Sequence, residues 1–470
     1  MFVALEGKNY VSNYYRYTLY DKNKELYLVT VDDGAFIFLN KSAFLQLKKG
    51  KIVDEEIYSK LLNKGIIINS SNFDNVVEKT KKRYSFLDNG TSLHIVIPTS
   101  RCNLKCRYCF AEPQEINASK DKYDMTPQIA KKTVDFIFKS PSEAVTIEFT
   151  GGEPLARFDI LQIMCNYAKE LNKERKKDLC LTVVTNLNLM TDEIAKWLIE
   201  NDVTICTSFD GPEELHNKMR VIEGANGKKI GTYQSVVGWI KKINLLYEEK
   251  GIDRRVNALM TITKHSFKYY REIIDEYVKL GIKIVDIRSL MFVGRALYES
   301  SKSYYYSQEE FFDFYKKSLE YIEELKKKGV DIEDRMKEEY EIKVLEQRPT
   351  YHIDYESPAG AAIGSLTYYS DGKIYAAHEA LGREEFLLGN INMKWSEIFK
   401  NKNTSFVVLS SMIESNVICD RCVYKPYCGT SSVENYYALG KFHFYPTKTA
   451  KHHETLFHTK RIFDEIVKEI

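Results

Sequence analysis

Three cysteines, Cys102, Cys106 and Cys109, follow an apolar segment in the spacing CxxxCxxC. Cysteines usually hold a 4Fe-4S cluster with four thiolates, so a three-cysteine loop leaves one iron open. S-adenosylmethionine fits an open iron, because its amino and carboxylate groups can chelate the metal while the reduced cluster passes an electron to the sulfonium. Structural zinc sites usually close four ligands, and no fourth cysteine lies near this loop. The spacing therefore predicts a cluster that starts radical chemistry.

A second element, Gly-Gly-Glu-Pro, follows the next predicted strand and begins at Gly151 and Gly152. Glycines allow a backbone to approach a ligand closely, and the carboxylate of Glu153 can accept hydrogen bonds from an ammonium group. Taken alone, this element would be a turn. Its place after a strand that follows the cysteine loop favours a binding role.

Together, these two elements resemble those of the radical SAM superfamily. The resemblance implies a 4Fe-4S cluster on the catalytic cysteines Cys102, Cys106 and Cys109, with S-adenosylmethionine as the cofactor. It also implies cofactor contacts from Tyr108 to the adenine, from Gly151, Gly152 and Glu153 to the methionine amine, from Asn186, Ser208 and Asp210 to the ribose, and from Arg220 to the carboxylate.

Several of these residues have an alternative interpretation. Asn186 and Asp210 could form only local turns or caps. His216, one helical turn before Arg220, is expected behind the site or in the core. Arg288 could contact a ligand or form a surface ion pair.

Strands alternate with helices between residues 90 and 300, which predicts a parallel sheet with right-handed crossovers. The predicted strands are 93–97, 145–149, 181–185, 204–208, 256–262 and 284–288. The predicted fold class is α/β, with a partial (β/α)6 TIM barrel as the radical SAM core. Chemistry in such barrels gathers at the carboxyl ends of the strands, where each of these motifs lies.

Residues 1–85 form a predicted separate module. A hairpin at 26–31 and 35–39 turns at Asp33-Gly34, a helix capped by Ser42 follows, and a second helix ends before Gly65. A closing strand at 66–68 makes the module winged-helix-like. It has no basic recognition helix, so we expect it to bind an extended peptide by strand addition.

Residues 301–345 are predicted bridging helices, and residues 346–470 form the C-terminal region. Cys419, Cys422 and Cys428 have the spacing CxxCx5C there, which partly resembles the SPASM auxiliary-cluster domain of peptide-modifying radical SAM enzymes. Ala359 and Ala377 stand where that domain has cysteines, and Ser431 or Ser432 takes the last cysteine position. Three alternatives stay open: an auxiliary 4Fe-4S cluster, with an open iron or an outside ligand such as His443, His452 or His453; a zinc ion; or no metal.

The remaining cysteines, Cys165, Cys180 and Cys206, are expected in the core. The chain has 68 basic and 66 acidic residues, so its charge suggests neither a nucleic-acid nor a membrane partner. Long apolar runs and a signal peptide are absent from the sequence, which predicts a soluble cytoplasmic protein.

The order of these parts resembles that of maturases of ribosomally synthesised precursor peptides, and it looks most like that of the His-Xaa-Ser system type. The expected partners are a precursor peptide with a leader segment and an electron donor such as flavodoxin or ferredoxin. The expected reaction is a crosslink, a thioether or an epimerisation, with Tyr368, Tyr369, Asp371 or Glu379 as the base. The alternatives are a sulfatase-maturase or cofactor-biosynthesis relative, and a non-catalytic scaffold that binds a leader.

Overall fold

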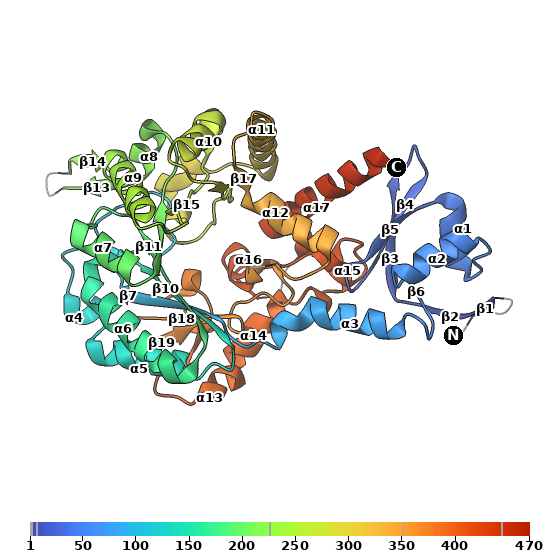
Figure 1. The fold of residues 1–470 in the computed structure, drawn as a ribbon, viewed down its shortest axis with the longest axis horizontal. Helices are drawn as coiled ribbons and strands as arrows, with labels where there is room; N and C mark the ends of the chain where they lie inside the picture. Colours follow the sequence, from blue (N-terminus) through green and yellow to red (C-terminus); the bar gives the residue numbers. More distant parts are fainter. Residues whose placement is uncertain (1–2, 6–7, 225–226, 351, 443–444) are drawn as a thin grey trace.

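The computed structural model describes residues 3–5, 8–224, 227–350, 352–442 and 445–470 (Figure 1). Its centre is an eight-stranded sheet with the order β15-β12-β11-β10-β7-β18-β19-β20. These strands are β7 (Leu93–Thr99), β10 (Ala144–Gly151), β11 (Asp178–Thr185), β12 (Val203–Ser208), β15 (Asn257–Leu259), β18 (Ser365–Tyr368), β19 (Lys373–Tyr375) and β20 (Leu387–Asn390). The first six strands in this order, from β15 through β12, β11, β10 and β7 to β18, run parallel to one another, as expected for a partial barrel.

Helices with capped ends cover the parallel strands. Thr126 accepts a hydrogen bond from the amide of Ile129 at the start of α5, and Thr191 does the same for Ile194 in α7. The helices of this region are α4 (Lys120–Tyr123), α5 (Pro127–Ile137), α6 (Phe158–Arg175), α7 (Asp192–Glu200), α8 (Glu213–Met219), α9 (Tyr233–Glu249) and α10 (Tyr270–Lys279). Figure 1 shows α5, α6 and α7 on the outer side of the sheet.

The predicted sixth barrel strand does not join this sheet. Strand β16 (Ile284–Val285) pairs in parallel with β17 (Glu333–Asp334) in a separate two-stranded sheet. The opposite edge is extended instead, because β18 pairs with β7 and brings the β18–β19 hairpin onto the barrel. Residues 370–372 form the turn of this hairpin. A two-residue strand has no hydrophobic period, so the sequence carries no signal for β17.

The N-terminal region has its own core, which includes Tyr10, Val31 and Phe44. Two three-stranded sheets, β1-β2-β6 and β3-β4-β5, carry two helices. The elements are β1 (Val3–Leu5), β2 (Lys8–Ser12), β3 (Tyr15–Asp21), β4 (Leu26–Val31), β5 (Phe36–Asn40), α1 (Lys41–Lys49), α2 (Glu55–Asn63) and β6 (Ile67–Ile68). The predicted hairpin is confirmed as β4–β5. Asn40, not Ser42, caps α1, because the helix begins directly after β5.

The N-terminal region lies against the second cysteine group. The hydroxyl of Thr30 donates to the carbonyl of Val423 at 2.8 Å, and the hydroxyl of Tyr427 donates to the carbonyl of Gly34 at 2.9 Å. Arg16 forms an ion pair with Asp420 at 3.3 Å. Helix α3 (Phe73–Tyr84) then leads to the barrel (Figure 1).

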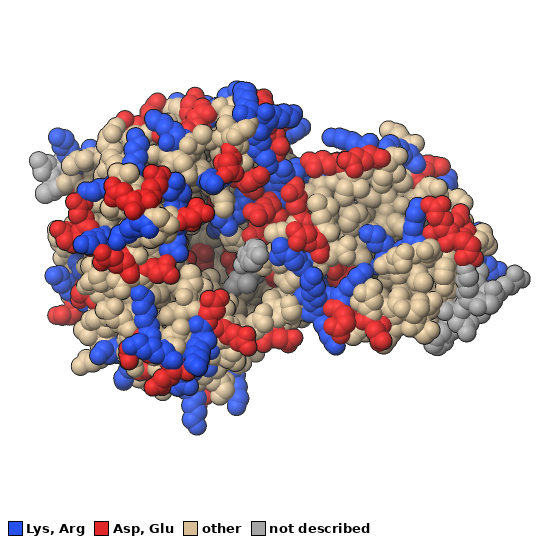
Figure 2. Space-filling view, viewed as in Figure 1, with Lys and Arg blue, Asp and Glu red and all other residues tan. Residues whose placement is uncertain are grey.

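The rest of the chain is mainly helical. Ser307 and Glu310 form a capping box at the start of α11. The helices are α11 (Gln308–Lys327), α12 (Arg335–Glu341), α13 (Trp395–Lys400), α14 (Lys402–Ser411), α15 (Val417–Asp420), α16 (Ser432–Leu439) and α17 (Ala450–Glu469). Among the described residues, no helix is both long and apolar enough to span a membrane. Figure 2 shows basic and acidic side chains mixed over one face.

Two of the three cysteines predicted in the core are buried there, namely Cys165 and Cys206. Cys180 is exposed, so that prediction is wrong. Burial alternates along β11 from Leu181 to Thr185, and Cys180 lies ahead of that stretch near the amino end of the strand.

Candidate active site

The cysteine loop starts from a buried ion pair. Arg101 donates to Asp124 from Nε to Oδ1 at 2.8 Å and from Nη2 to Oδ2 at 2.7 Å. Thr99 donates to the same carboxylate at 2.6 Å. Burial opposes the charge on Asp124, but the bonds from Arg101 and Thr99 prevail and lower its pKa. Since Arg101 and Cys102 together form β8, this pair fixes the position of the first cysteine.

Two other segments hold the rest of the loop. The amide of Lys105 donates to the carbonyl of Val221 at 2.9 Å, just after α8, and the amide of Arg107 donates to the carbonyl of Met219 at 3.1 Å, at the end of α8. The amide of Arg295 donates to the carbonyl of Cys109 at 2.9 Å.

Gly294 and Arg295 are positioning residues that the sequence analysis missed. A Cβ on Gly294 would lie 2.4 Å from the carbonyl oxygen of Phe110, so only glycine allows this approach. The available signal was a Gly-Arg pair shortly after the last predicted barrel strand.

The two glycines of the Gly-Gly-Glu element pack closely against the segment from Ile97 to Arg101. A Cβ on Gly152 would lie 2.2 Å from the carbonyl oxygen of Arg101, and Gly151 has a φ of +117°. The amide of Gly152 donates to Thr99, and the amide of Glu153 donates to Arg101. In this structure the two glycines let the Gly-Gly-Glu element lie directly on the start of the cysteine loop. Their predicted contact with a ligand stays a prediction.

We expect Gly152→Ala to destabilise the protein by at least about 2 kcal/mol, since the added methyl must displace backbone rather than a flexible side chain. Chemical denaturation of the purified protein measures this change. Gly238→Ala is the matched control: no atom lies within 4 Å of its Cβ position, and it sits in helix α9, where alanine should stabilise by about 0.5–1 kcal/mol. Equal stability of the two variants would contradict the packing argument.

Glu153 lies at the bottom of the site and is 1% exposed. Its carboxyl group accepts hydrogen bonds from the hydroxyl of Thr185 at 2.6 Å, the amide of Asn186 at 2.8 Å and the amide of Leu155 at 3.1 Å. Burial raises its pKa to about 7, although these three hydrogen bonds oppose the shift. The group can therefore gain or lose a proton near neutral pH.

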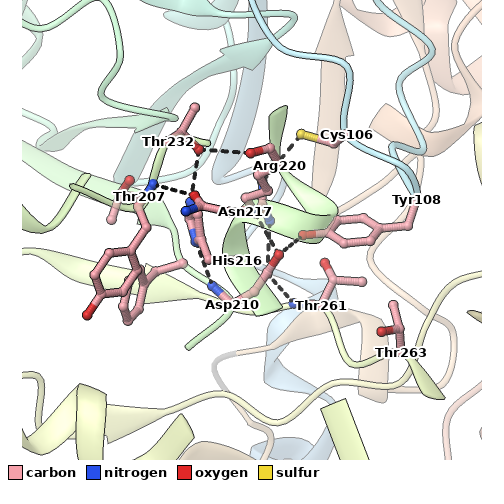
Figure 3. A network of polar contacts seen from close by, with 12 residues as sticks. Cys106, Tyr108, Thr207, Asp210, His216, Asn217, Arg220, Thr232, Thr261 and Thr263 are labelled. Atoms are coloured by element: carbon pink, nitrogen blue, oxygen red, sulfur yellow. Dashed lines mark hydrogen bonds and ion pairs between the residues drawn. The ribbon is translucent and has the colours of Figure 1, made fainter. Parts of the chain in front are cut away.

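Asp210, Arg220 and Tyr108 form a buried network beside the cysteine loop (Figure 3). Arg220 Nε lies 3.0 Å from Asp210 Oδ2, and Tyr108 donates its hydroxyl to the same oxygen. The guanidinium lies 5.2 Å from the centre of the Tyr108 ring, within cation–π range. The amide of Thr261 also donates to Asp210, at 3.2 Å. In this arrangement Asp210 holds the arginine and the tyrosine together.

His216 supports this network from behind, as expected. It is fully buried, and its two ring nitrogens contact the amide of Asp210 at 3.4 Å and the hydroxyl of Thr232 at 3.1 Å. That hydroxyl in turn donates to the carbonyl of Arg220 at 3.0 Å. Arg220 was expected on the same helix as His216, but α8 ends at Met219 and Arg220 has extended backbone.

The other predicted contact residues lie at strand ends. Asn186 follows β11, and its side chain donates to Asn103 at 2.9 Å. Ser208 ends β12 and is partly buried. Arg288 pairs with the buried Asp286 at 2.8 Å and also lines a cavity, so both of its predicted roles stay open.

The donor set at the loop suits an iron–sulfur cluster. Burial raises the pKa of Cys106 to about 11 and raises that of Cys109. Arg220 Nη1 lies 3.8 Å from Cys106 Sγ, and Asn186 Nδ2 lies 3.8 Å from Cys102 Sγ. Hydrogen bonds of this kind to sulfur set the potential of such clusters.

In the described part of the chain, no three Cys, His, Asp or Glu side chains are placed to share one metal ion. A cluster does not need such a convergence, because each thiolate binds a different iron.

The second cysteine group is also partly enclosed. Burial raises the pKa of Cys419 to about 12 and that of Cys428 to about 11. Among the described residues, these three cysteines are not placed to share one metal ion. The auxiliary cluster, the zinc ion and the metal-free alternative stay open. His443 lies outside the described residues. Ser431 caps α16, and Ala359 is buried.

The structure thus places a three-cysteine loop at the carboxyl ends of the strands of a partial barrel. A buried Arg–Asp–Tyr network and the carboxyl group of Glu153 lie next to this loop, and the arrangement could hold a cofactor. The family comparison agrees: residues 96–243 match the Radical SAM superfamily. This part of the chain is therefore similar to a radical SAM domain.

Curated relatives share about a quarter of their aligned residues with the chain. The radical SAM cyclopropyl synthase TigE of Paramaledivibacter caminithermalis is 25% identical over 259 residues, which cover 52% of this chain and 51% of TigE. The chain thus spans about half the length of that relative. A cysteine-type anaerobic sulfatase-maturating enzyme of Clostridium perfringens is 25% identical over 345 residues, covering 72% of this chain and 87% of that enzyme.

Solved structures share the fold. Native anSMEcpe with bound AdoMet has a TM-score of 0.64 at 18% identity, covering 80% of this chain and 98% of that one. Streptococcus suis SuiB bound to precursor peptide SuiA has a TM-score of 0.54 at 14% identity, covering 92% and 97%. This likeness supports the α/β fold but does not test the winged-helix-like and SPASM-like descriptions, which stay predictions.

Proposed function

We propose that this protein is a radical SAM enzyme that modifies a ribosomally synthesised precursor peptide. The observation that carries this proposal is the cysteine loop itself, held from three sides beside Glu153 and the Asp210–Arg220 pair. Similarity to enzymes that mature proteins or peptides, and fold likeness to structures with bound peptides, support the peptide substrate.

Cys102, Cys106 and Cys109 would hold the 4Fe-4S cluster, and nearby polar groups would orient S-adenosylmethionine. Glu153 can accept from its ammonium group, and Arg220 can pair with its carboxylate while Asp210 holds the guanidinium. A reduced cluster held by these residues would supply one electron for cleavage of S-adenosylmethionine into methionine and a 5'-deoxyadenosyl radical, and this radical would remove a hydrogen atom from the peptide. Cys102, Cys106 and Cys109 are partly buried, which limits access of water to the loop.

Deoxyadenosine release tests this proposal. Anaerobically reconstituted, reduced protein should release deoxyadenosine from S-adenosylmethionine even without peptide. Co-expression with a peptide encoded by a neighbouring short open reading frame should change the mass of that peptide. Cluster-loaded protein that releases no deoxyadenosine would instead favour the leader-binding scaffold.

Cofactor affinity should fall in acid because of Glu153. Its pKa of about 7 lies above the usual carboxyl value, so the charged form is present above pH 7 and is lost as the pH falls. Binding of an ammonium group needs the carboxylate, so we expect affinity for S-adenosylmethionine to fall about tenfold between pH 8 and pH 6. Equilibrium binding at several pH values measures this slope. Glu153→Gln should bind S-adenosylmethionine weakly, and its affinity should depend less on pH than that of the wild type. If the affinity of both proteins changes equally with pH, a group other than Glu153 causes the pH dependence.

We also propose that the leader segment docks on the edge strand β3 as an added strand. Leu19 and Tyr17 lie two residues apart on this edge strand and are 40% and 45% exposed. Such exposed apolar side chains on an edge strand suit strand addition, whereas lysine blocks it.

Leu19→Lys should therefore weaken binding of a labelled leader peptide by about tenfold, a loss typical of one anchoring side chain. Fluorescence anisotropy measures the affinity. Leu245→Lys is the control, because Leu245 is 53% exposed on helix α9 of the barrel. Equal leader affinity for the wild type and Leu19→Lys would place the leader elsewhere.

For Cys419, Cys422 and Cys428 we propose one auxiliary 4Fe-4S cluster, next to the contacts that Thr30 and Arg16 make with the same loop. A flavodoxin or ferredoxin as electron donor and a cytoplasmic location complete the proposal.

A sulfatase-maturase-like activity on a protein is the second candidate, favoured by the match that covers 87% of the Clostridium perfringens enzyme. If the protein modifies a sulfatase peptide but not the peptide encoded by the neighbouring short open reading frame, this second candidate is the correct function.

A further inference from the structure

A tight turn after β11 fixes the orientation of the Asn186 side chain. Leu187 has a φ of +59°, a left-handed backbone conformation that leucine rarely adopts. The amide of Asn188 then donates to Asn186 Oδ1 at 2.9 Å, and the Asn188 side chain lies 3.3 Å from the same oxygen. Since a backbone N–H can only donate, the Asn186 atom that it faces must be the oxygen. The nitrogen of the Asn186 amide therefore lies on the other side.

On that other side lies the cysteine loop. Asn186 Nδ2 donates to Asn103 Oδ1 at 2.9 Å and lies 3.8 Å from Cys102 Sγ. Asn186 is only 8% exposed, and its backbone amide donates to Glu153 Oε2 at 2.8 Å. The N–H group that faces the Cys102 sulfur is thus held through both the backbone and the side chain of Asn186.

These contacts use the whole hydrogen-bonding capacity of the Asn186 side chain. An asparagine amide offers two N–H donors and two oxygen lone pairs. The donors face Asn103 and Cys102, and both lone pairs face N–H groups of Asn188. A ribose hydroxyl would have to displace one of these four contacts. The predicted ribose contact therefore finds no free position on Asn186.

We propose that Asn186 is a positioning residue that donates to the Cys102 sulfur and raises the reduction potential of the cluster, and that it does not contact the ribose. An electron that enters a cluster adds negative charge to its sulfur ligands, and an N–H donor stabilises that charge. Loss of the donor should therefore make the cluster harder to reduce. This inference rests on the proposed function, because it concerns the cluster that Cys102, Cys106 and Cys109 would hold.

The midpoint potential of the cluster, measured without S-adenosylmethionine, tests the inference, because a ribose contact has no effect when no cofactor is bound. Asn186→Leu removes both N–H donors, so the reduction equilibrium should fall about fivefold, or about 40 mV at about 59 mV per tenfold. A redox titration followed by electron paramagnetic resonance measures this shift. Asn172→Leu is the matched control and should keep the wild-type potential, because the Asn172 amide bonds to the backbone of Lys177 at the amino end of β11.

A second variant guards against loss of the cluster. Asn186→Asp keeps an acceptor for the amide of Asn188 but removes both donors and adds a negative charge, so it should lower the potential at least as far. Thermal melting and iron and sulfide analysis check that each variant is folded and loaded. A loaded Asn186→Leu with the wild-type potential would overturn the proposal. If that variant takes up no cluster, Asn186→Asp decides by the same criterion.

Cofactor analogues test whether Asn186 contacts the ribose. The probes are S-adenosylmethionine and its 2'-deoxy and 3'-deoxy analogues, and equilibrium binding to the oxidised, cluster-loaded protein measures their affinities. The wild type and Asn186→Leu should show the same ratios of affinity within about twofold, as expected for groups that do not interact. A preference for the full ribose that disappears in the variant would refute the proposal. Deoxyadenosine release by the wild type is measured separately, so a failure of the proposed function is distinguished from a failure of this inference.

Discussion

Cys106→Ala should reduce deoxyadenosine formation to background. Cys106 is the middle cysteine of the loop, and its sulfur lies 3.8 Å from Arg220 Nη1. Its loss removes one of only three cluster ligands, so we expect a fall greater than the 10–100-fold that is typical when a group behind a metal ligand is removed. Product analysis by liquid chromatography measures this loss, and iron and sulfide analysis should show a reduced cluster content.

Cys180→Ala is the control for this experiment, since Cys180 is an exposed thiol on β11 outside the loop. It should change stability by no more than about 0.5 kcal/mol and leave product formation unaltered. If Cys106→Ala forms as much deoxyadenosine as the wild type, the cysteine loop has no role in the reaction.

Asp210→Asn should be the most destabilising single change in the site. The side chains of Asp210 and Arg220 are 1% and 9% exposed, so the substitution leaves a buried guanidinium without its counter-charge. Breaking a buried ion pair in this way costs about 3–5 kcal/mol. Urea denaturation measures the loss, and Asp192→Asn, whose partner Lys242 is exposed, should cost less than about 1 kcal/mol.

A double variant separates the charge from the packing. Arg220→Met added to Asp210→Asn removes the uncompensated charge, so it should recover part of the lost stability. If the double variant is no more stable than Asp210→Asn, the ion pair is not the source of the effect.

The local motifs could be predicted because their chemistry lies in consecutive residues. The cysteine loop and the Gly-Gly-Glu element are found at the predicted strand ends, and β7, β10, β11 and β12 lie close to the predicted bounds. Continuous apolar runs bounded by turn residues make buried parallel strands recognisable.

Contacts between distant residues could not be predicted. The Asp210–Arg220 pair depends on where α8 ends, and the sequence carries no signal for that pairing. The close approach of Gly152 to the Arg101 carbonyl likewise joins residues about fifty positions apart. The predicted cofactor contacts of Arg220 and Gly152 stay predictions. The addition of β18 beside β7 joins residues more than two hundred positions apart, and no local pattern encodes that pairing.

Electron paramagnetic resonance of the reduced, cluster-loaded protein tests the central claim most directly. If the three cysteines leave one iron open, adding S-adenosylmethionine should change the spectrum of the cluster at the cysteine loop, and Cys106→Ala should lose that response. A spectrum that is the same with and without S-adenosylmethionine would contradict the account.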